Sequence, residues 1–421
     1  MQFEKPTLFP SLKVFVGVMV FLWLLIMVRL YFEYKSYQDF ISKPFYFTNA
    51  LVLNSYEKHK KSKRYQVLKL RSEEGFTFYT TTHEKQSLKH HSLRLKIIPN
   101  KRISFKEYLG TFYLKSRISS KRQEATTWKD RLVKQIYAQH SDERLGSFYS
   151  AIFFATPLGP LLREKISLLG VSHLVALSGF HLGILWGLVY GLLLLLYRPL
   201  QQRFFPYRYA LIDVGFVAIL ILGFYVWFVG YPPSLLRSYA MVLVGWVALL
   251  MGVEFISFTF LFSILTVLIL LFPSLLVSLG FWLSIAGVFY IFLLLHYSKL
   301  FTRWSITLWI IPLGIFLFMQ PVIHTVFTVS SSYQLLSPLL SLLFVVFYPL
   351  VMMLHLLGLG MWFDEALLRL FTIAEGSSDK LLPLWMLFVY MGVSLGAIRS
   401  KKLFFLLLFL AISYSIYLFY M

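Results

Sequence analysis

Long apolar runs make up most of the chain, and a single polar block interrupts them. The first run, Val14–Phe32, is broken only by Arg29. A helix needs about 20 such residues to cross the hydrocarbon of a bilayer. The later candidate spans are Leu168–Tyr197, Tyr209–Gly230, Ser238–Gly252, Ile256–Phe272, Ser274–Tyr297, Ser305–Ser330, Gln334–Leu357, Leu382–Ser400 and Leu403–Met421. The pattern predicts a polytopic α-helical membrane protein with about ten transmembrane or re-entrant helices.

The polar block, Glu33–Ser147, has the pattern of a small β domain. Within Ser92–Ile98, apolar and basic residues alternate, which is the period of a half-buried strand. Polar turns such as Glu57–Arg64 separate five β-branched or aromatic runs, which are Phe45–Asn54, Tyr65–Arg71, Phe76–Thr82, Ser92–Ile98 and Gly110–Ser119. Five short strands of this size predict a small β-rich, OB-like barrel.

The residues between the polar block and the later spans predict helices at the membrane surface. Trp128, Leu132 and Ile136 recur at helical spacing among the charges of Thr126–Glu143, which is an amphipathic pattern. Gly146–Leu162 is apolar but contains two prolines, so we expect a short re-entrant or interfacial piece there.

Composition supports a membrane protein with an anionic partner. Of the 421 residues, 58% are hydrophobic and 14% charged, whereas soluble domains carry roughly a quarter charged residues. The chain has no cysteine, which excludes disulfides, thiolate metal sites and cysteine nucleophiles. The formal net charge is +21, and Glu33–Ser147 holds 24 Lys and Arg against 11 Asp and Glu. Such an excess favours binding to a polyanion.

The charge distribution also predicts an orientation. Lys5 and Lys13 precede the first run, which places the N-terminus in the cytoplasm. The first run lacks a small-residue cleavage site, so we interpret it as a retained anchor. The polar block then lies outside the cytoplasm.

Basic and aromatic residues interleave in the predicted barrel. The candidate DNA-binding residues are Lys60, Lys61, Lys63, Arg64 and Tyr65, and further aromatics are Tyr56, Phe76, Tyr79 and Tyr108. Barrels of this class bind single strands by stacking bases on aromatics beside a cationic groove. The alternative is that the aromatics form the barrel core and the lysines a solvated loop.

The stretch Gly170–Gly191 is unusual for a membrane anchor. It contains His173 and His181, and ionisable residues at membrane depth favour a functional role. Ser178 precedes glycines spaced every fourth residue, and we expect a helix break at Ser178–Gly179. The glycines are Gly179, Gly183, Gly187 and Gly191, a pattern that predicts close packing against another helix.

Two further stretches place polar groups at membrane depth. In Tyr231–Arg237 two prolines end a helix, and Ser234 is expected to cap the next one. With Arg237, that helix start would attract an anion. Ser278 and Ser284 lie in another apolar segment, where they either face a pore or bond their own helix.

The two histidines do not predict a metal site. In a continuous helix, eight residues separate them by about 12 Å along the axis. No carboxylate lies nearby, and the chain has no H-E-x-x-H motif. We therefore expect neither a metal nor another cofactor. Structural histidines and histidines lining a polar path both remain open.

Three motifs resemble the ComEC family, the inner-membrane DNA channels of natural transformation. His173–Gly183, reading HLVALSGFHLG, is similar to the family signature. Pro233–Arg237 is similar to its Pro-Ser-x-x-Arg motif. Gly280–Ser284 is similar to its Gly-Phe-Gln-Leu-Ser motif, with Trp282 in place of glutamine. The resemblance covers roughly residues 30–350 and implies the same OB-like domain. Many relatives also carry a metallo-β-lactamase-like domain that degrades one strand. This chain lacks its motif, so another protein is expected to do so.

The resemblance implies a domain order along the chain. Residues 1–32 form the N-terminal membrane anchor, 33–125 the OB-like basic extracytoplasmic domain, and 126–165 amphipathic or interfacial helices. Residues 166–357 form the competence channel core, and 358–421 a C-terminal amphipathic segment and membrane helices.

These observations predict a channel, not an enzyme, that passes single-stranded DNA across the bacterial inner membrane. The predicted DNA path comprises His173, Ser178, Gly179, His181, Ser234, Arg237, Ser278 and Ser284. The chain has no P-loop motif, so a cytoplasmic motor or DNA-capture protein is expected to supply direction. Other expected partners are membrane lipids, a periplasmic DNA-binding protein and a second copy of the chain. The alternative is a permease or a lipid- or glycan-handling membrane enzyme whose basic domain binds headgroups.

Overall fold

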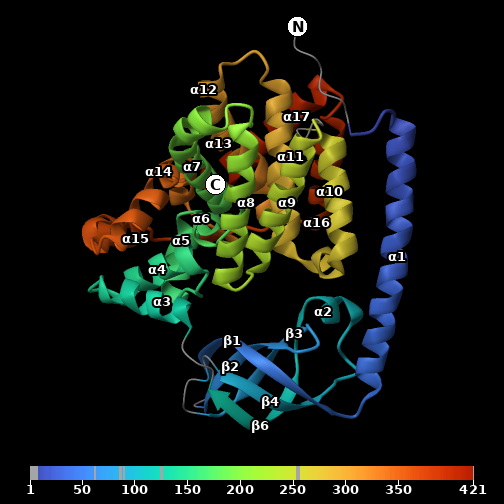
Figure 1. Cartoon of the computed structure of the whole chain (residues 1–421). Coiled ribbons are helices and arrows are strands. Elements are labelled where there is room, and N and C mark those ends of the chain that lie inside the picture. The colour runs from blue at the N-terminus through green and yellow to red at the C-terminus, as the bar shows by residue number, and fades with distance from the viewer. Residues whose placement is uncertain are drawn as a thin grey trace. The chain divides into compact units, whose positions relative to one another are not determined.

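A computed structural model describes residues 8–60, 63–84, 88, 91–123, 127–252 and 257–420. The chain divides into two compact units. The barrel unit comprises Phe9–Arg131 and Phe262–Leu279, and the bundle unit comprises Leu132–Leu261 and Gly280–Met421 with Met1–Leu8. The division falls inside α3 (Trp128–Ala138) and α10 (Phe258–Leu271) (Figure 1).

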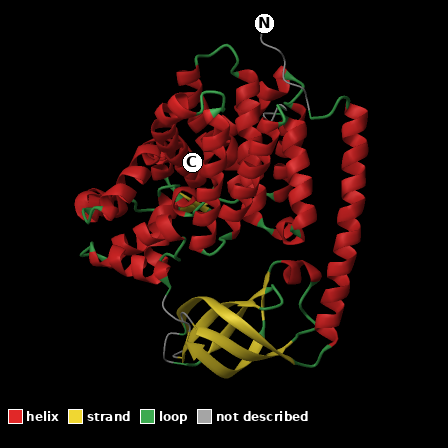
Figure 2. Ribbon diagram, viewed as in Figure 1, coloured by secondary structure: helices red, strands yellow, loops and turns green. Residues whose placement is uncertain are grey.

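The barrel unit confirms the five predicted strand regions (Figure 2). Its strands are β1 (Tyr46–Lys60), β2 (Lys63–Ser72), β3 (Thr77–Thr82), β4 (His91–Ile98), β5 (Thr111–Tyr113) and β6 (Lys115–Gln123). The sheet order is β5-β3-β2-β1-β4-β6. Leu114 alone separates β5 from β6. One segment therefore pairs with β3 in parallel and with β4 antiparallel, which closes the sheet into a barrel.

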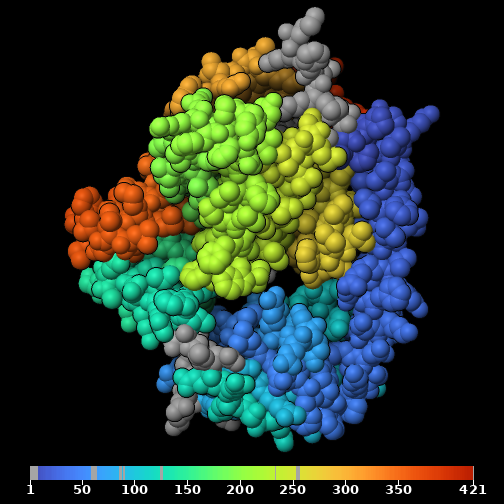
Figure 3. Space-filling model, in the orientation of Figure 1, coloured from blue at the N-terminus to red at the C-terminus, as the bar shows by residue number. Residues whose placement is uncertain are grey.

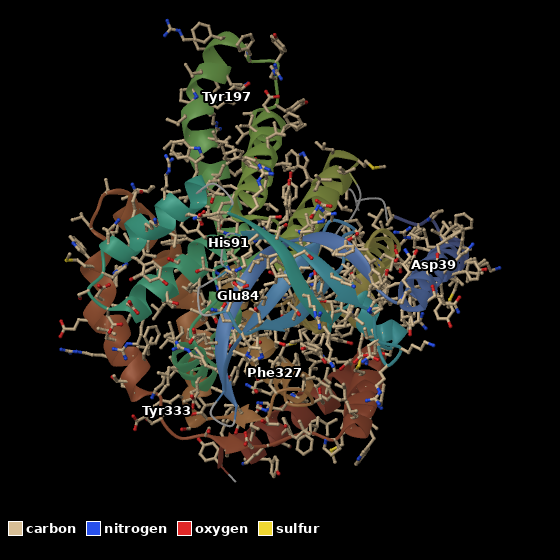
Figure 4. All side chains as sticks on the ribbon, turned by 90° about the horizontal axis from the view of Figure 1, so that it is seen from below. Asp39, Glu84, His91, Tyr197, Phe327 and Tyr333 are labelled. Atoms are coloured by element: carbon tan, nitrogen blue, oxygen red, sulfur yellow. The ribbon has the colours of Figure 1, made fainter. Side chains whose placement is uncertain are left out.

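The hairpin between the first two strands is longer than predicted. Glu57–Arg64 was expected to be a polar turn, but β1 continues to Lys60 and β2 begins at Lys63, with these two residues paired. Glu57 and Arg64 are exposed there and form an ion pair across the two strands. Glu84 lies two residues after β3, and His91 is the first residue of β4 (Figure 4).

Alternation along β4 gives the barrel its core. Leu93, Leu95 and Ile97 are fully buried, while Arg94 is exposed. Buried side chains of the other strands complete the core, which also includes Phe112 and is flanked by Phe76, Tyr108 and the short α2 (Phe105–Leu109). The alternative reading of Phe76 and Tyr108 as core-packing residues is therefore correct.

The first helix extends well beyond its apolar run. α1 covers Leu12–Ser42, whereas the predicted boundary between anchor and barrel was at residue 32. Its last turns present Tyr37 and Phe40 to the barrel. The Tyr37 hydroxyl donates a 2.7 Å hydrogen bond to the Ile103 carbonyl, and Phe40 lies in the barrel core. The helix therefore continues past residue 32, because Tyr37 and Phe40 in its last turns bury apolar area against the barrel.

The bundle unit contains most of the membrane-length helices. Its green to yellow segments lie together on the face shown in Figure 3. Among the described residues of the whole chain, seven helices are long and apolar enough to cross a membrane. They are α1, α7 (Gly179–Phe204), α8 (Ala210–Val229), α11 (Leu279–Tyr297), the continuous Arg303–Ile323 and Ser332–Leu356, and α17 (Lys401–Tyr420). Three apolar helices are shorter: α9 (Pro233–Leu250), α10 and α16 (Leu384–Gly396). The expected count of about ten thus includes helices too short to cross alone.

Two of the long spans are composite. Arg303–Ile323 consists of α12 (Arg303–Ser305), the π-helical η2 (Ile306–Ile310) and α13 (Ile311–Ile323). Ser332–Leu356 consists of η3 (Ser332–Leu336) and α14 (Ser337–Leu356).

The predicted span Leu168–Tyr197 is not one helix. After α3 come α4 (Glu143–Phe154), α5 (Pro160–Leu168) and α6 (Ser172–Val175), and α7 begins only at Gly179. The break at Ser178–Gly179 is therefore confirmed. Short segments connect the remaining helices: η1 (Pro273–Val277), η4 (Gly360–Phe363), α15 (Asp364–Ile373), and the strands β7 (Val329–Ser330) and β8 (Ser378–Asp379). Phe327 and Tyr333 flank β7 (Figure 4).

Candidate functional site

A helix cap defines where α7 begins, after the break. Ser178 has extended backbone angles and precedes the first helical residue, Gly179. The Ser178 amide lies 3.4 Å from Nδ1 of His181, three residues on. A residue that caps a helix start in this way satisfies first-turn groups and fixes the direction of the helix.

The loop before α9 is tightly bent. Gly230 and Tyr231 both have positive φ, 95° and 54°, and positive φ is strained for a tyrosine. Pro232 occupies the N-cap position of α9 without a side-chain cap, so the prediction that Ser234 is the cap was wrong. The Ser234 hydroxyl instead donates a 2.6 Å hydrogen bond to the Leu177 carbonyl in the break before α7.

Close backbone approach brings the starts of α7 and α9 together. A Cβ atom added at Gly179 would lie 2.9 Å from the Ser238 hydroxyl oxygen, closer than real Cβ atoms come. Ser238 in turn donates to the Ser234 carbonyl at 2.9 Å. Ser238 of α9 therefore leaves little room for a side chain at residue 179. This agrees with the close helix packing predicted for Gly179.

The first turn of α11 reaches the same place. The Arg237 guanidinium carbon lies 5.9 Å from the centre of the Phe281 ring, a cation–π distance. A Cβ at Gly280 would be 3.4 Å from an Arg237 nitrogen. The three motifs, far apart in the sequence, thus meet around the first two turns of α9.

The resulting site is positively charged. Each helix N-terminus carries the equivalent of about half a positive charge on its free amides. Three such ends, those of α7, α9 and α11, gather with the Arg237 side chain. Helix N-termini with an arginine are an arrangement that binds phosphate and other anions.

One face of α14 forms the other side of the α6–α7 junction. His173 Nε2 lies 3.2 Å from the Ser341 hydroxyl, which itself donates to the Ser337 carbonyl at 2.7 Å. The Ser337 hydroxyl donates to the Gly170 carbonyl at 3.0 Å. Sequence reasoning missed these residues. The signal was present, because Gln334, Ser337, Ser341, Tyr348 and His355 recur at helical spacing within an apolar span.

A family comparison matches this half of the chain. The family model described as competence protein matches residues 158–421, more than half of the chain. The chain belongs to the ComEC-type competence protein family. It is therefore a membrane protein of competence and DNA uptake. Neither the curated proteins nor the solved structures include a match to it.

The family model matches residues 158–421, whereas we expect the resemblance over roughly residues 30–350. Resemblance of the residues before 158 stays a prediction. All three motifs around Arg237 fall inside the matched residues. The matched residues do not include the barrel, whose description comes from its strand order and pairing.

The predicted path residues have different environments. His173, Gly179 and Ser284 are exposed, and Ser178, Ser234 and Arg237 are partly buried. His181 is fully buried between Phe344 and Tyr348, with ring centroids 5.1 and 4.9 Å away. The His181 ring thus completes the core beneath the start of α7, which favours the alternative of a structural histidine, and its role in lining a path stays a prediction. Ser278 lies in the barrel unit, at the end of η1.

Three of the four glycines of α7 have no close neighbour among the described atoms of one copy of the chain. Among the described atoms, none lies within 4 Å of a Cβ built at Gly183, Gly187 or Gly191. Close approach is thus seen at Gly179, whereas packing of another helix on the other three glycines stays a prediction. α7 packs on α8 through another face, where the Tyr197 hydroxyl (labelled in Figure 4) donates a 2.8 Å hydrogen bond to Asp213, and these three glycines are exposed.

The predicted DNA-binding residues of the barrel lie at the β1–β2 hairpin. Arg64 forms an ion pair with Glu57, and Tyr65 is partly buried. Lys61 lies outside the described residues, as do the side chains of Lys60 and Lys63.

Sequence reasoning missed a second basic and aromatic surface on the barrel. The Lys96 nitrogen lies 3.8 Å from the centre of the exposed Phe45 ring. The Arg94 guanidinium lies 5.9 Å from the exposed Phe47 ring. We call Phe45, Phe47, Arg94 and Lys96 the β1–β4 face. Its two exposed rings lie just before β1 (Phe45) and within β1 (Phe47), where a solvent-facing surface would be expected to carry polar residues.

No metal site is present among the residues described. In that part of the chain, no group of three or more His, Cys, Asp or Glu side chains could hold a metal ion.

Proposed function

We propose that this protein conducts single-stranded DNA across the bacterial inner membrane during natural transformation. The observation that carries the proposal is the meeting of three helix N-termini with Arg237 inside the family-matched region. A phosphodiester backbone is a string of single negative charges, and it crosses hydrocarbon only where protein groups replace its water. The positive ends of the three helices and the guanidinium offer such groups at membrane depth.

The exposed neighbours of this site suit a polymer rather than a small ion. His173 and Ser284 present polar groups, and Phe180 at the start of α7 is 39% exposed. An aromatic ring beside phosphate-binding amides provides a surface on which an unpaired base can stack. The site needs no bound metal and performs no chemistry in this account, so the chain acts as a conduit and not as an enzyme.

The barrel is the proposed external receiver of DNA. We infer an OB-like fold, counting β5 and β6 as one fifth strand. Its β1–β4 face places two exposed phenylalanines beside two cations. Stacking and phosphate contact from one surface is the way such barrels hold single strands. With the N-terminus in the cytoplasm, the barrel lies outside and receives DNA from a periplasmic DNA-binding protein.

The proposal assigns the driving force to a partner. A cytoplasmic motor or DNA-capture protein pulls the strand that the channel conducts. A second copy of the chain is a further candidate partner, because the glycines of α7 beyond Gly179 present a bare helix face to the bilayer.

Arg237→Gln is the test of the conduit. Uptake of labelled DNA into the cytoplasm is expected to fall by at least tenfold, while DNA still reaches the periplasm and the protein still inserts. Arg203→Gln, at the far end of α7, is the matched control and should leave uptake unchanged. Normal uptake by Arg237→Gln would refute the role. Normal uptake after deletion of the whole gene, with altered lipid composition, would favour the headgroup-binding alternative.

A further inference from the structure

A buried cluster away from Arg237 joins the turn after α3 to the corner between α14 and α15. The His140 side chain is fully buried, and its Nδ1 lies 3.0 Å from both carboxylate oxygens of Asp364. His140 Nε2 lies 3.0 Å from Nε2 of His355. The other ring nitrogen of His355, Nδ1, lies 2.6 Å from the Val351 carbonyl. We call these three titratable residues the histidine clamp.

The hydrogen-bond donors and acceptors of the clamp determine how many protons it holds. A carbonyl only accepts, so His355 Nδ1 carries a hydrogen, and its Nε2 in the neutral ring is a bare lone pair. That lone pair must accept from His140 Nε2–H. The remaining contact, between His140 Nδ1 and the Asp364 carboxyl, then needs a hydrogen of its own, whichever partner carries it. The clamp therefore holds one proton more than an ionised carboxylate and two neutral imidazoles would.

Without this proton, the two Nε2 lone pairs would face each other or a buried hydrogen bond to Asp364 would be lost. Either arrangement is unfavourable in the dry interior. The surroundings provide little alternative solvation. The Tyr149 ring stacks on His140 at 4.7 Å, and its centroid lies 4.4 Å from that of His355. Burial raises the pKa of the Tyr149 phenol, so Tyr149 is neutral, and Asp364 provides the only negative charge described against the pair.

Hydrogen bonds between uncharged groups also connect the turn after α3 to the end of α14. The Gln139 side-chain amide donates to the His355 carbonyl at 3.0 Å, and its oxygen accepts from the Gly360 amide at 2.9 Å. A Cβ at Gly360 would come within 2.8 Å of His355 Nε2. The turn after α3 is thus fastened to the end of α14 through two adjacent residues, Gln139 and His140.

We propose that the histidine clamp is a proton-binding site whose single excess proton fastens the α3–α4 turn to the end of α14. The contact is complete at low pH, where the proton is bound. It weakens as pH rises and the proton leaves, because the unprotonated cluster cannot satisfy all of its groups. The clamp is a pH-dependent joint in the bundle unit.

The joint lies on the helix that borders the site around Arg237. His355 belongs to the same polar stripe of α14 as Ser341, which contacts His173, and Tyr348, which packs on His181. Loosening the end of α14 therefore acts on a helix that supports the α6–α7 junction. The proton site itself does not depend on what crosses the membrane.

The absence of cysteine allows a direct test in the full-length chain. Spin labels on Lys134→Cys in α3 and Glu365→Cys in α15, both exposed positions, report the distance across the joint in nanodiscs. Between about pH 5 and pH 9, on either side of free imidazole titration, a short distance should give way to a longer or broader one. The ratio of open to closed forms should rise by at most about tenfold per pH unit, since one proton is released.

Two variants make the assignment specific. Asp364→Asn removes the counter-charge, so the transition should move to lower pH. The double variant His140→Phe, His355→Leu should give a distance that does not change with pH. A wild-type distance independent of pH would overturn the proposal, as would an unshifted transition in Asp364→Asn. A closed form that EDTA abolishes and Zn²⁺ restores at constant pH would also overturn it, because the occupant would then be a metal.

Discussion

The Ser234 hydroxyl donates a 2.6 Å hydrogen bond to the Leu177 carbonyl. This bond joins the first turn of α9 to the break before α7, 57 residues earlier in the chain. A carbonyl at a helix break inside a membrane protein has no partner of its own, so a side chain must satisfy it. The bond therefore fixes the distance between two of the three helix N-termini that surround Arg237.

Removing this hydroxyl should loosen the site without changing its charge. Ser234→Ala leaves the Leu177 carbonyl unsatisfied, and we expect a loss of about 1–3 kcal/mol in unfolding free energy. DNA uptake should fall as well, since the N-termini of α7 and α9 are no longer held together. Thermal unfolding in detergent and a transformation assay measure the two effects.

Ser284→Ala is the control for that experiment. Ser284 is exposed on α11, so its loss should not change thermal stability. If both alanine variants unfold like the wild type, the Ser234 bond does not hold the junction.

The glycines of α7 should divide into one sensitive position and one tolerant position. At Gly179 an added methyl would meet the Ser238 hydroxyl at 2.9 Å, so Gly179→Ala should displace α9 and reduce uptake. At Gly187 no described atom is within 4 Å, and alanine should even favour the helix, by up to about 1 kcal/mol. Thermal stability and transformation of the two variants should separate clearly.

A converse result for Gly187 would also be informative. If Gly187→Leu lowers transformation while the purified monomer remains as stable as wild type, a second copy of the chain packs on the bare face. If Gly179→Ala behaves like the wild type, the close approach of α7 and α9 is not required.

The barrel should depend on the end of α1 for its stability. Phe40→Ala removes a ring from the barrel core, and we expect a cost of about 3–5 kcal/mol. The barrel should then become sensitive to limited proteolysis in the full-length protein. Phe32→Ala, on an exposed part of the same helix, is the control and should leave the digestion pattern unchanged.

Local sequence patterns predicted the helices and strands of this protein better than they predicted the contacts between them. Alternation predicted β4 and its buried Leu93, and the Ser-Gly pair predicted the break before α7. The burial of His181 could not be predicted, because Phe344 and Tyr348 come from a helix more than 150 residues later. Contact across such a separation depends on how whole helices pack, and the helical period of α14 shows only that it has a polar face.

The same limit applies to the barrel. The lysines before Arg64 formed the most basic run in the sequence, yet the exposed aromatics lie on β1 beside Lys96. Cross-strand neighbours depend on register, and a run of residues does not specify its partner strand.

The β1–β4 face should contribute to DNA binding by the full-length protein. The double variant Phe45→Ala, Phe47→Ala should weaken binding to a labelled single-stranded oligonucleotide by at least tenfold, because stacking contributes about 1–3 kcal/mol per base. Lys96→Gln should reduce the dependence of binding on salt. Tyr113→Ala, an exposed aromatic on β5, is the control. Equal affinity in all of these variants would remove the barrel from the DNA path.

The most direct test of the account captures DNA beside Arg237 during uptake. A photoreactive benzoylphenylalanine in place of Phe180, at the start of α7, should form a covalent adduct with incoming single-stranded DNA on illumination. The same residue in place of Phe224, exposed on α8, should form none. DNA adducts at position 180 alone are the predicted result. Adducts at neither position in cells that still transform normally would show that DNA crosses elsewhere.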